Sequence, residues 1–117
     1  MKKILALCSV LILILTIFAS CNNNKTTSTG RCLVTIDNQY LIVMNNSPVV
    51  MSNQSRKDNL FEEIKTGDMI KITHDGINES YPGQTGVYSC SILKTGTISD
   101  ISKEVISSLN EMGWTFK

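Results

Sequence analysis

The chain has 117 residues, 42% of them hydrophobic, and a formal net charge of +1. This length allows one small domain. Its charges are scattered along the chain, and without Lys2 and Lys3 the balance is −1. Nucleic-acid binding needs a basic stripe that neutralises phosphates, so this charge pattern argues against nucleic acid as a partner.

The first 20 residues have the pattern of an export signal. Lys2 and Lys3 form a positive start, and residues 4–19 are almost wholly apolar. This run is slightly shorter than the ~18 residues that a membrane-spanning helix usually needs. It ends in small residues, as signal peptides do. Residues 1–20 are therefore predicted to be a signal peptide.

Cys21 follows directly. The sequence Phe18-Ala19-Ser20-Cys21 resembles the bacterial lipobox, although leucine is more usual at the position of Phe18. The resemblance implies that Cys21 carries lipid and becomes the new N-terminus, and two or more acyl chains form a stable anchor. A simple secretory signal, or an N-terminal membrane helix with an incidental cysteine, is the alternative. The expected location is the cell envelope, on a bacterial membrane and outside the cytoplasm.

Residues 21–30 are predicted to be a flexible tether. After Cys21 they are polar or small, and such a composition cannot bury a core. A flexible chain of this length has a root-mean-square reach of ~15–18 Å. The folded domain is therefore expected to span residues 31–117.

Apolar and polar residues alternate in the first part of this domain, as they do in β-strands. Residues 31–37 and 40–45 are predicted strands joined by a turn at Asn38-Gln39. Residues 46–59 are expected to be mostly loop, with a brief strand at Val49-Val50-Met51. Residues 60–64 suit one helical turn.

The central part predicts three more strands. Residues 69–73 alternate cleanly and are followed by a tight-turn signal at Asp75-Gly76. A short strand at 77–81 leads to a second turn at Pro82-Gly83, with a trans bond expected before the proline. A long strand is predicted at 85–95.

Near the C-terminus the spacing of apolar residues changes from that of a strand to that of a helix. Apolar residues recur at helical spacing, which predicts a helix over 100–112 packed against the barrel. Gly113 is a natural stop, and Trp114 and Phe116 are expected to fold back onto the domain. The predicted contact residues of the helix are Ile101, Val105, Leu109 and Met112.

Two cysteines remain in the exported domain. Alternation directs Cys32 and Cys90 inward, so they form a candidate disulfide, which could contribute ~4 kcal/mol to stability. Two buried free thiols are the equal alternative. A metal site is not expected, because His74 is the single histidine and no CxxC motif occurs.

Residues 64–93 resemble the central segment of YobA-like proteins, a family of small exported bacterial proteins of unknown function. The shared features are Gly67-Asp68, which opens a strand, and the run Glu79-Ser80-Tyr81-Pro82 before the next long strand. The resemblance implies a small OB-like β-barrel and no particular activity. Together with the period-two pattern, it predicts a mainly β domain: a five-stranded barrel over 31–95 with a C-terminal helix.

The run Glu79-Ser80-Tyr81-Pro82 is a candidate binding edge. A carboxylate, a hydroxyl and an aromatic ring beside a rigid turn could hold a sugar or a peptide, and OB-type barrels bind such ligands. The alternative is a structural corner, in which Tyr81 covers the barrel end and the polar groups bond loop amides.

The expected function is a non-catalytic binding module anchored in the cell envelope. His74-Asp75 adjoins a predicted turn with no nucleophile tied to it, so neither enzyme activity nor a cofactor is expected. The partners expected are the membrane, through the lipid, and an envelope protein, peptide or polysaccharide. The alternative is a structural or accessory lipoprotein without a small-molecule ligand.

Overall fold

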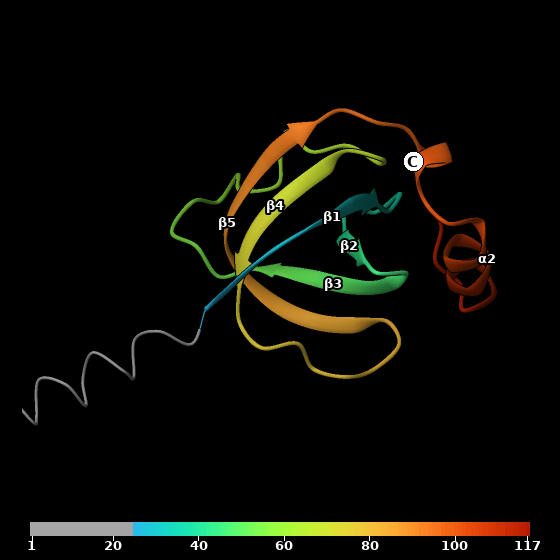
Figure 1. Cartoon of the computed structure of the whole chain (residues 1–117), viewed down its shortest axis with the longest axis horizontal. Coiled ribbons are helices and arrows are strands. Elements are labelled where there is room, and N and C mark those ends of the chain that lie inside the picture. Colours follow the sequence, from blue (N-terminus) through green and yellow to red (C-terminus); the bar gives the residue numbers. More distant parts are fainter. Residues whose placement is uncertain (1–24) are drawn as a thin grey trace, which may run out of the picture.

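The computed structural model describes residues 25–117, and Figure 1 shows a barrel with a helix on one side. This arrangement confirms the predicted fold class, a mainly β five-stranded barrel followed by a short helix. The elements are β1 (Thr26–Val34), β2 (Tyr40–Met44), β3 (Ser47–Asn53), β4 (Met69–His74), β5 (Gly83–Lys94), the 3-10 turn η1 (Ile98–Asp100) and α2 (Lys103–Glu111). No helix within the described residues is long and apolar enough to cross a membrane.

The sheet closes on itself in the order β1-β2-β3-β5-β4. β4 pairs with β1 to complete the circle, and β3 and β5 are the single parallel pair. The strands are steeply tilted, as the pairing around the barrel shows. In one direction Val34 at the end of β1 pairs with Tyr40, which pairs with Met51 in β3. In the other direction Thr26 at the start of β1 pairs with His74, His74 with Val87, and Val87 with Asn53, only two residues further along β3. Closure of a barrel requires such tilt and stagger.

β1 begins at Thr26, inside the segment predicted to be a tether. The tether prediction is therefore wrong for residues 26–30, each of which pairs with β4. Polar composition shows that a segment cannot build a core, but strand pairing needs only backbone groups, and threonine favours strands. Gly30 passes so close to β2 that a Cβ would lie 2.5 Å from the carbonyl oxygen of Val43. Residues 1–24, including the predicted signal and Cys21, lie outside the described part of the chain.

The barrel interior is filled by side chains that alternate along the strands. In β4, Ile70 and Ile72 point inward and are fully buried, while Lys71 between them is exposed, as predicted. Burial of each such side chain stabilises the fold by roughly 1.5–3 kcal/mol. The buried interior cluster consists of Cys32, Val34, Ile42, Val49, Met51, Phe61, Ile64, Ile70, Ile72 and Val87.

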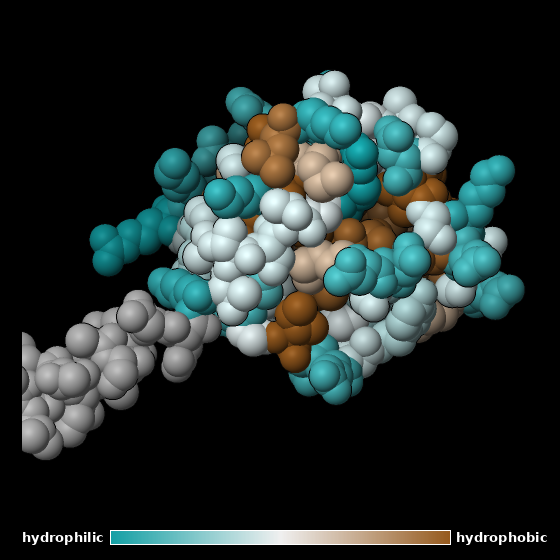
Figure 2. Space-filling model, viewed as in Figure 1, coloured by the Kyte–Doolittle hydropathy of each residue, from teal (hydrophilic) through white to brown (hydrophobic). Residues whose placement is uncertain are grey.

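A second cluster joins the outside of the barrel to the C-terminal segment. Leu33 and Leu41 point away from the interior and are covered by the helix. Ile101, Val105 and Leu109 form the helix side of this cluster, and Trp114 and Phe116 pack against it, as predicted. Figure 2 shows hydrophobic side chains gathered where the barrel meets the C-terminal segment.

Met112 does not join this cluster, contrary to prediction. α2 ends at Glu111, and Gly113 turns the chain with φ of +98°. Met112 is therefore past the last helical turn, and its side chain is 51% exposed. The predicted start of the helix was also early, because residues 98–100 form a separate 3-10 turn.

The segment 46–59 contains more strand than predicted. β3 covers Ser47–Asn53 and forms a tight hairpin with β2. Asn45 and Asn46 both have positive φ, of 50° and 62°, which the two central residues of a type I′ hairpin turn require. Asparagine tolerates this conformation better than most residues. The pair Asn45-Asn46 is therefore a hairpin signal that the sequence analysis missed.

Residues 58–63 form successive turns, with a hydrogen bond from the backbone N–H of Ile64 to the carbonyl oxygen of Phe61, close to the single helical turn predicted at 60–64.

Three further predictions, all in the loop before β5, are wrong. The expected tight turn at Asp75-Gly76 is the start of a longer loop over 75–82. The strand predicted at 77–81 is absent from this loop, where Asn78 makes only an isolated bridge to Gln84. The peptide bond between Tyr81 and Pro82 is cis rather than trans.

The pair Gly67-Asp68 forms a structural corner before β4. Gly67 has φ of +96°, and a Cβ there would lie 2.3 Å from backbone atoms of Thr97. The buried carboxylate of Asp68 accepts hydrogen bonds from the backbone N–H of Lys65 at 3.0 Å and of Gly96 at 3.3 Å. The pair thus connects the start of β4 to the chain that follows β5.

Candidate functional site

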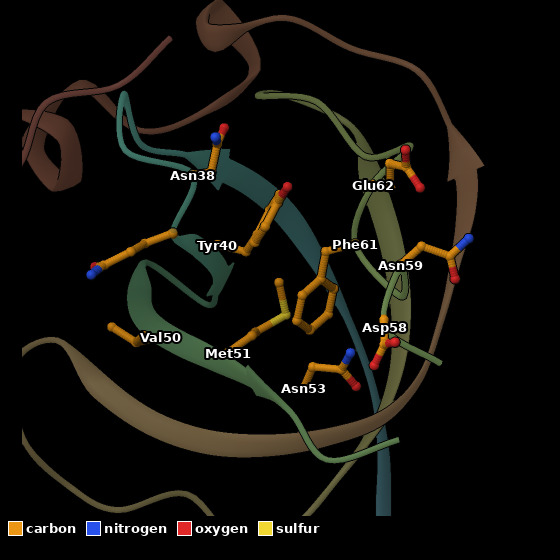
Figure 3. A pocket seen from close by; sticks show the side chains of 10 residues that line it. Asn38, Tyr40, Val50, Met51, Asn53, Asp58, Asn59, Phe61 and Glu62 are labelled. Atoms are coloured by element: carbon orange, nitrogen blue, oxygen red, sulfur yellow. The ribbon is translucent and has the colours of Figure 1, made fainter. Parts of the chain in front are cut away.

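A hollow of about 660 Å³ opens on the β2–β3 side of the barrel. This volume is in the usual range for ligand sites. Three segments contribute to it: the turn before β2, the second half of β3 and residues 58–62 (Figure 3). The lining residues are Asn38, Gln39, Tyr40, Val50, Met51, Asn53, Asp58, Asn59, Phe61 and Glu62.

The floor of the hollow is apolar. The rings of Tyr40 and Phe61 lie 5.1 Å apart between centroids and are tilted by 39°, and Met51 lies beside them (Figure 3). Phe61 and Met51 are buried, whereas Tyr40 is half-buried. Tilted aromatic pairs at this distance are favourable. The floor is therefore part of the core and still presents one aromatic ring to the hollow.

Strand pairing and a tight turn fix the position of Tyr40. Tyr40 is the first residue of β2, paired with Val34 on one side and Met51 on the other. The preceding turn is closed by hydrogen bonds from the backbone N–H groups of Asn38 and Gln39 to Thr35, and Asn38 has φ of +65°. The turn predicted at Asn38-Gln39 is confirmed, and it places both amide side chains at the rim.

One wall of the hollow is held by Asn53. Its side-chain oxygen accepts hydrogen bonds from the backbone N–H and the hydroxyl of Ser55, at 2.9 and 2.6 Å. Its side-chain nitrogen donates to the carbonyl oxygen of Lys57 at 2.5 Å. Because both ends of this amide are engaged, Asn53 shapes the loop and is not available for a ligand.

The rest of the rim is polar and carries negative charge. Asp58 and Glu62 supply carboxylates, and no lysine or arginine lines the hollow. The side chain of Lys117 donates a hydrogen bond to Asn38, at the edge of the hollow. Among the described residues, no hydrogen bond or ion pair engages four of the rim side chains, namely Gln39, Asp58, Asn59 and Glu62.

The predicted binding edge, Glu79-Ser80-Tyr81-Pro82, lies elsewhere and does not line this hollow. It is part of the exposed loop 75–82, where Tyr81 is 48% exposed. The hydroxyl of Ser80 donates to the carbonyl oxygen of Pro82 at 2.8 Å, so it serves the loop itself. The hollow was not predicted, because each of its polar residues, taken alone, looks like an ordinary polar residue of a turn or loop.

His74 is buried at the end of β4 and is 3% exposed. Its Nδ1 lies 2.6 Å from the carbonyl oxygen of Asp75, which can only accept a hydrogen bond, so Nδ1 carries the proton. Its Nε2 then accepts from the hydroxyl of Ser28 at 2.8 Å. No cluster of three or more potential metal ligands occurs among residues 25–117.

Cys32 and Cys90 are both free thiols in the structure, Cys32 buried and Cys90 partly buried. Cys32 belongs to the interior cluster, and Cys90 packs against it. Burial raises the pKa of Cys90 to about 11. Burial, and then the negative charges of Cys90 and Asp68, raise the pKa of Cys32 further still. Both thiols are therefore protonated at neutral pH and weakly reactive.

Comparisons of the chain with protein-family models, curated proteins and solved structures found no match. The resemblance of residues 64–93 to YobA-like proteins stays a prediction. The candidate site therefore depends on the geometry and chemistry of the hollow alone.

Proposed function

We propose that this protein is a lipid-anchored, non-catalytic binding module of a bacterial cell envelope, and that the hollow beside β2 and β3 holds its ligand. The single observation that carries the proposal is the hollow itself. It combines an apolar floor that includes a half-buried aromatic ring with a rim of polar side chains that have no partner among the described residues. Ligand sites in proteins typically have this combination.

The strand order supports an OB-like assignment. Five strands close in the order β1-β2-β3-β5-β4, with a helical segment packed outside. OB-type barrels bind oligosaccharides and oligonucleotides on the face of strands 2 and 3 and on neighbouring loops. The hollow borders these two strands at the barrel end, where Tyr40 and Met51 pack with the interior cluster, and this argument from fold analogy adds to the chemistry of the site.

The anchor part of the proposal comes from the sequence around Cys21. Residues 22–25 alone separate Cys21 from the start of β1. Five extended steps of chain span at most about 18 Å. A lipid on Cys21 would therefore hold the Thr26 end of the barrel close to the membrane, with less freedom than the longer predicted tether would allow.

The proposal can be tested by photo-crosslinking in the native envelope. A photoreactive amino acid is placed at Glu62, which lines the hollow, and in a matched protein at Glu63, the next residue, which does not. Both side chains are exposed glutamates. We expect adducts from position 62 in membranes of the living bacterium and few from position 63. Equal adduct yields at the two positions, or none at position 62, would refute the binding function of the hollow.

The accessory-lipoprotein alternative has one observation in its favour. Ile92, Leu93 and Ile98 are exposed apolar residues in and after the C-terminal half of β5. Such residues suit contact with a protein partner. A photoreactive residue at Leu93 distinguishes the two functions: protein adducts from position 93, without adducts from position 62, would favour the accessory role.

A further inference from the structure

We propose that the ligand of the hollow is an uncharged glycan, bound with one sugar ring against Tyr40 and its hydroxyl groups at the rim. This inference rests on the proposed binding function and names the ligand class. It is carried by three features of the hollow: its charge, its aromatic floor and the hydrogen-bonding capacity of its unpartnered side chains.

The charge of the rim disfavours anionic ligands. Asp58 and Glu62 are exposed carboxylates, and no lysine or arginine lines the hollow, although Lys117 reaches its edge at Asn38. Two negative charges a few ångströms from a phosphate or a carboxylate repel it, and each such interaction costs about 1 kcal/mol near water. Nucleic acids and phosphate-bearing envelope polymers therefore do not suit this site.

The floor suits a ring with an apolar face. Tyr40 is half-buried, backed by Phe61, and held by strand pairing on both sides. A sugar ring has an apolar C–H face and a rim of hydroxyl groups. Its C–H face can cover the tyrosine ring and remove apolar surface from water, while the hydroxyl groups stay at the edge.

The unpartnered rim side chains match hydroxyl groups in particular. Gln39 and Asn59 carry both donors and acceptors, and Asp58 and Glu62 supply acceptors only. A hydroxyl group both donates and accepts, so it can bond to either kind of side chain. Four polar side chains over one aromatic floor can thus satisfy several hydroxyl groups of one or two sugar units.

A peptide fits the hollow less well. Peptides often bind by adding a strand to an open sheet edge. Here β2 is paired with β1 and β3, and β3 is paired with β2 and β5, so neither strand offers a free edge. A basic peptide remains the competing ligand with suitable charge, and the experiment below includes it.

Methionine-methyl NMR of the full chain in detergent micelles tests the inference. Met51 lines the hollow, whereas Met69, at the start of β4, does not and serves as an internal control. The probes are cellotetraose, chitotetraose and maltotetraose as neutral glycans, trilysine as a basic peptide, and an oligothymidylate as an anion. We expect at least one glycan to shift the Met51 signal and leave the Met69 signal unchanged.

Two further readouts separate glycan binding from charge attraction. Glycan affinity should not change between low and high salt, because salt screens interactions between charges only. Asn59→Ala should weaken glycan binding roughly 2–10-fold, as expected for the loss of one hydrogen bond. The matched variant Asn110→Ala removes an exposed asparagine of the helix that does not line the hollow, and it should leave binding unchanged.

The outcomes distinguish the failure of this inference from the failure of the proposed function. Shifts of Met51 with trilysine or the oligothymidylate, and not with glycans, would overturn the glycan assignment while the binding function stands. Absence of any shift with the three glycans at millimolar concentration would also overturn it. The binding function itself is judged separately, by the crosslinks from position 62.

Discussion

Polar side chains gather in two regions of this barrel, and the two regions use them differently. At the end of β4, His74 bonds to Ser28 and to the carbonyl oxygen of Asp75, and the hydroxyl group of Tyr88 donates to the carboxylate of Asp75. Thr85 donates to the same carbonyl oxygen. At the hollow, most of the rim side chains have no such partner within the described residues.

The difference follows from the elements that supply the residues. Around His74 they lie on strands that pair with one another, so their distances are fixed by the ladder between β1, β4 and β5. Around the hollow the unpartnered side chains come from the turn before β2 and from residues 58–62, which no strand ladder joins. Polar groups with internal partners stabilise a fold, whereas polar groups above an apolar floor without partners are available to a ligand.

The largest expected effect concerns the anchor, which would place the His74 region near the membrane. Cys21→Ala should abolish incorporation of labelled palmitate and release the protein from the membrane fraction, because the lipid has no other attachment residue in the lipobox-like sequence. Cys8→Ala, inside the predicted signal, is the matched control and should leave labelling intact. Undiminished labelling of the Cys21 variant would refute the proposed anchor at Cys21. It would also refute the orientation that places the His74 region near the membrane.

The next largest effect is on the free energy of unfolding, which compares the region around His74 with the rim of the hollow. His74→Ala leaves the Ser28 hydroxyl without its partner, removes one of the two donors to the Asp75 carbonyl oxygen and creates a cavity at a site that is 3% exposed. We expect the free energy of unfolding to fall by about 2–4 kcal/mol.

Asn59→Ala at the rim should change the same quantity by no more than about 0.5 kcal/mol, because its side chain is exposed. Urea unfolding followed by the fluorescence of Trp114 measures both variants. Equal losses would show that the rim is as much a part of the fold as the His74 region, and the contrast between the regions would fail.

Much of the fold could be predicted from the sequence, and little of the site. Ile70 and Ile72 alternate with Lys71, and Ile101, Val105 and Leu109 recur at helical spacing, so local periodicity identifies a strand and a helix. The start of β1 was missed because Thr26–Gly30 contributes pairing rather than burial.

The hollow was missed for a different reason. Tyr40 and Met51 meet across the β2–β3 hairpin, whose turn at Asn45-Asn46 was not recognised, and Phe61 reaches them from the loop that follows β3. The run at Glu79 was more conspicuous in the sequence, yet its Ser80 hydroxyl group bonds within its own loop. The local pattern of residues thus reveals single strands and helices, whereas a site assembled from several segments requires the register between them.

A smaller effect comes from the thiols inside the barrel. The pKa of Cys90 is raised to about 11 by burial, above the model-peptide value of about 8.5–9. Between these values the unfolded thiol loses its proton while the folded one keeps it, so the free energy of unfolding should fall as the pH rises from about 9 to about 11. Cys90→Ala should reduce this slope, as read from urea midpoints across that range.

This pH effect requires the thiols to be free. Mass spectrometry of the exported protein, alkylated while denatured but not reduced, should show an alkyl group on both Cys32 and Cys90, as the free thiols of the structure imply. If neither residue is alkylated, the two are joined by the disulfide that the sequence left open, and no thiol titration can occur.

The smallest expected effect is on the titration of Tyr88. It tests whether the hydrogen-bonded region around His74 forms in solution as described. Its hydroxyl group donates to both carboxylate oxygens of Asp75, at 2.9 and 3.0 Å, and this hydrogen bond raises the pKa of Tyr88, with smaller contributions from desolvation and from the charge of Asp75. Ionisation would break the bond and place two negative charges side by side. The unfolded phenol, with a pKa of about 10, loses its proton first, so the stability that this bond contributes should decline as the pH rises above that value.

Asp75→Asn should lower the pKa of Tyr88 toward its ordinary value, because the amide oxygen accepts a hydrogen bond without carrying charge. Absorbance of the phenolate measures the titration, and Tyr88→Phe identifies which of the three tyrosines is responsible. Asp58→Asn, at the rim of the hollow, makes the same chemical change where no such bond exists and should leave the titration of Tyr88 where it was. A Tyr88 that titrates at the same pH in both aspartate variants would mean that Asp75 is as unengaged as the rim carboxylates. The distinction between the hydrogen-bonded region around His74 and the unpartnered rim of the hollow would then no longer hold.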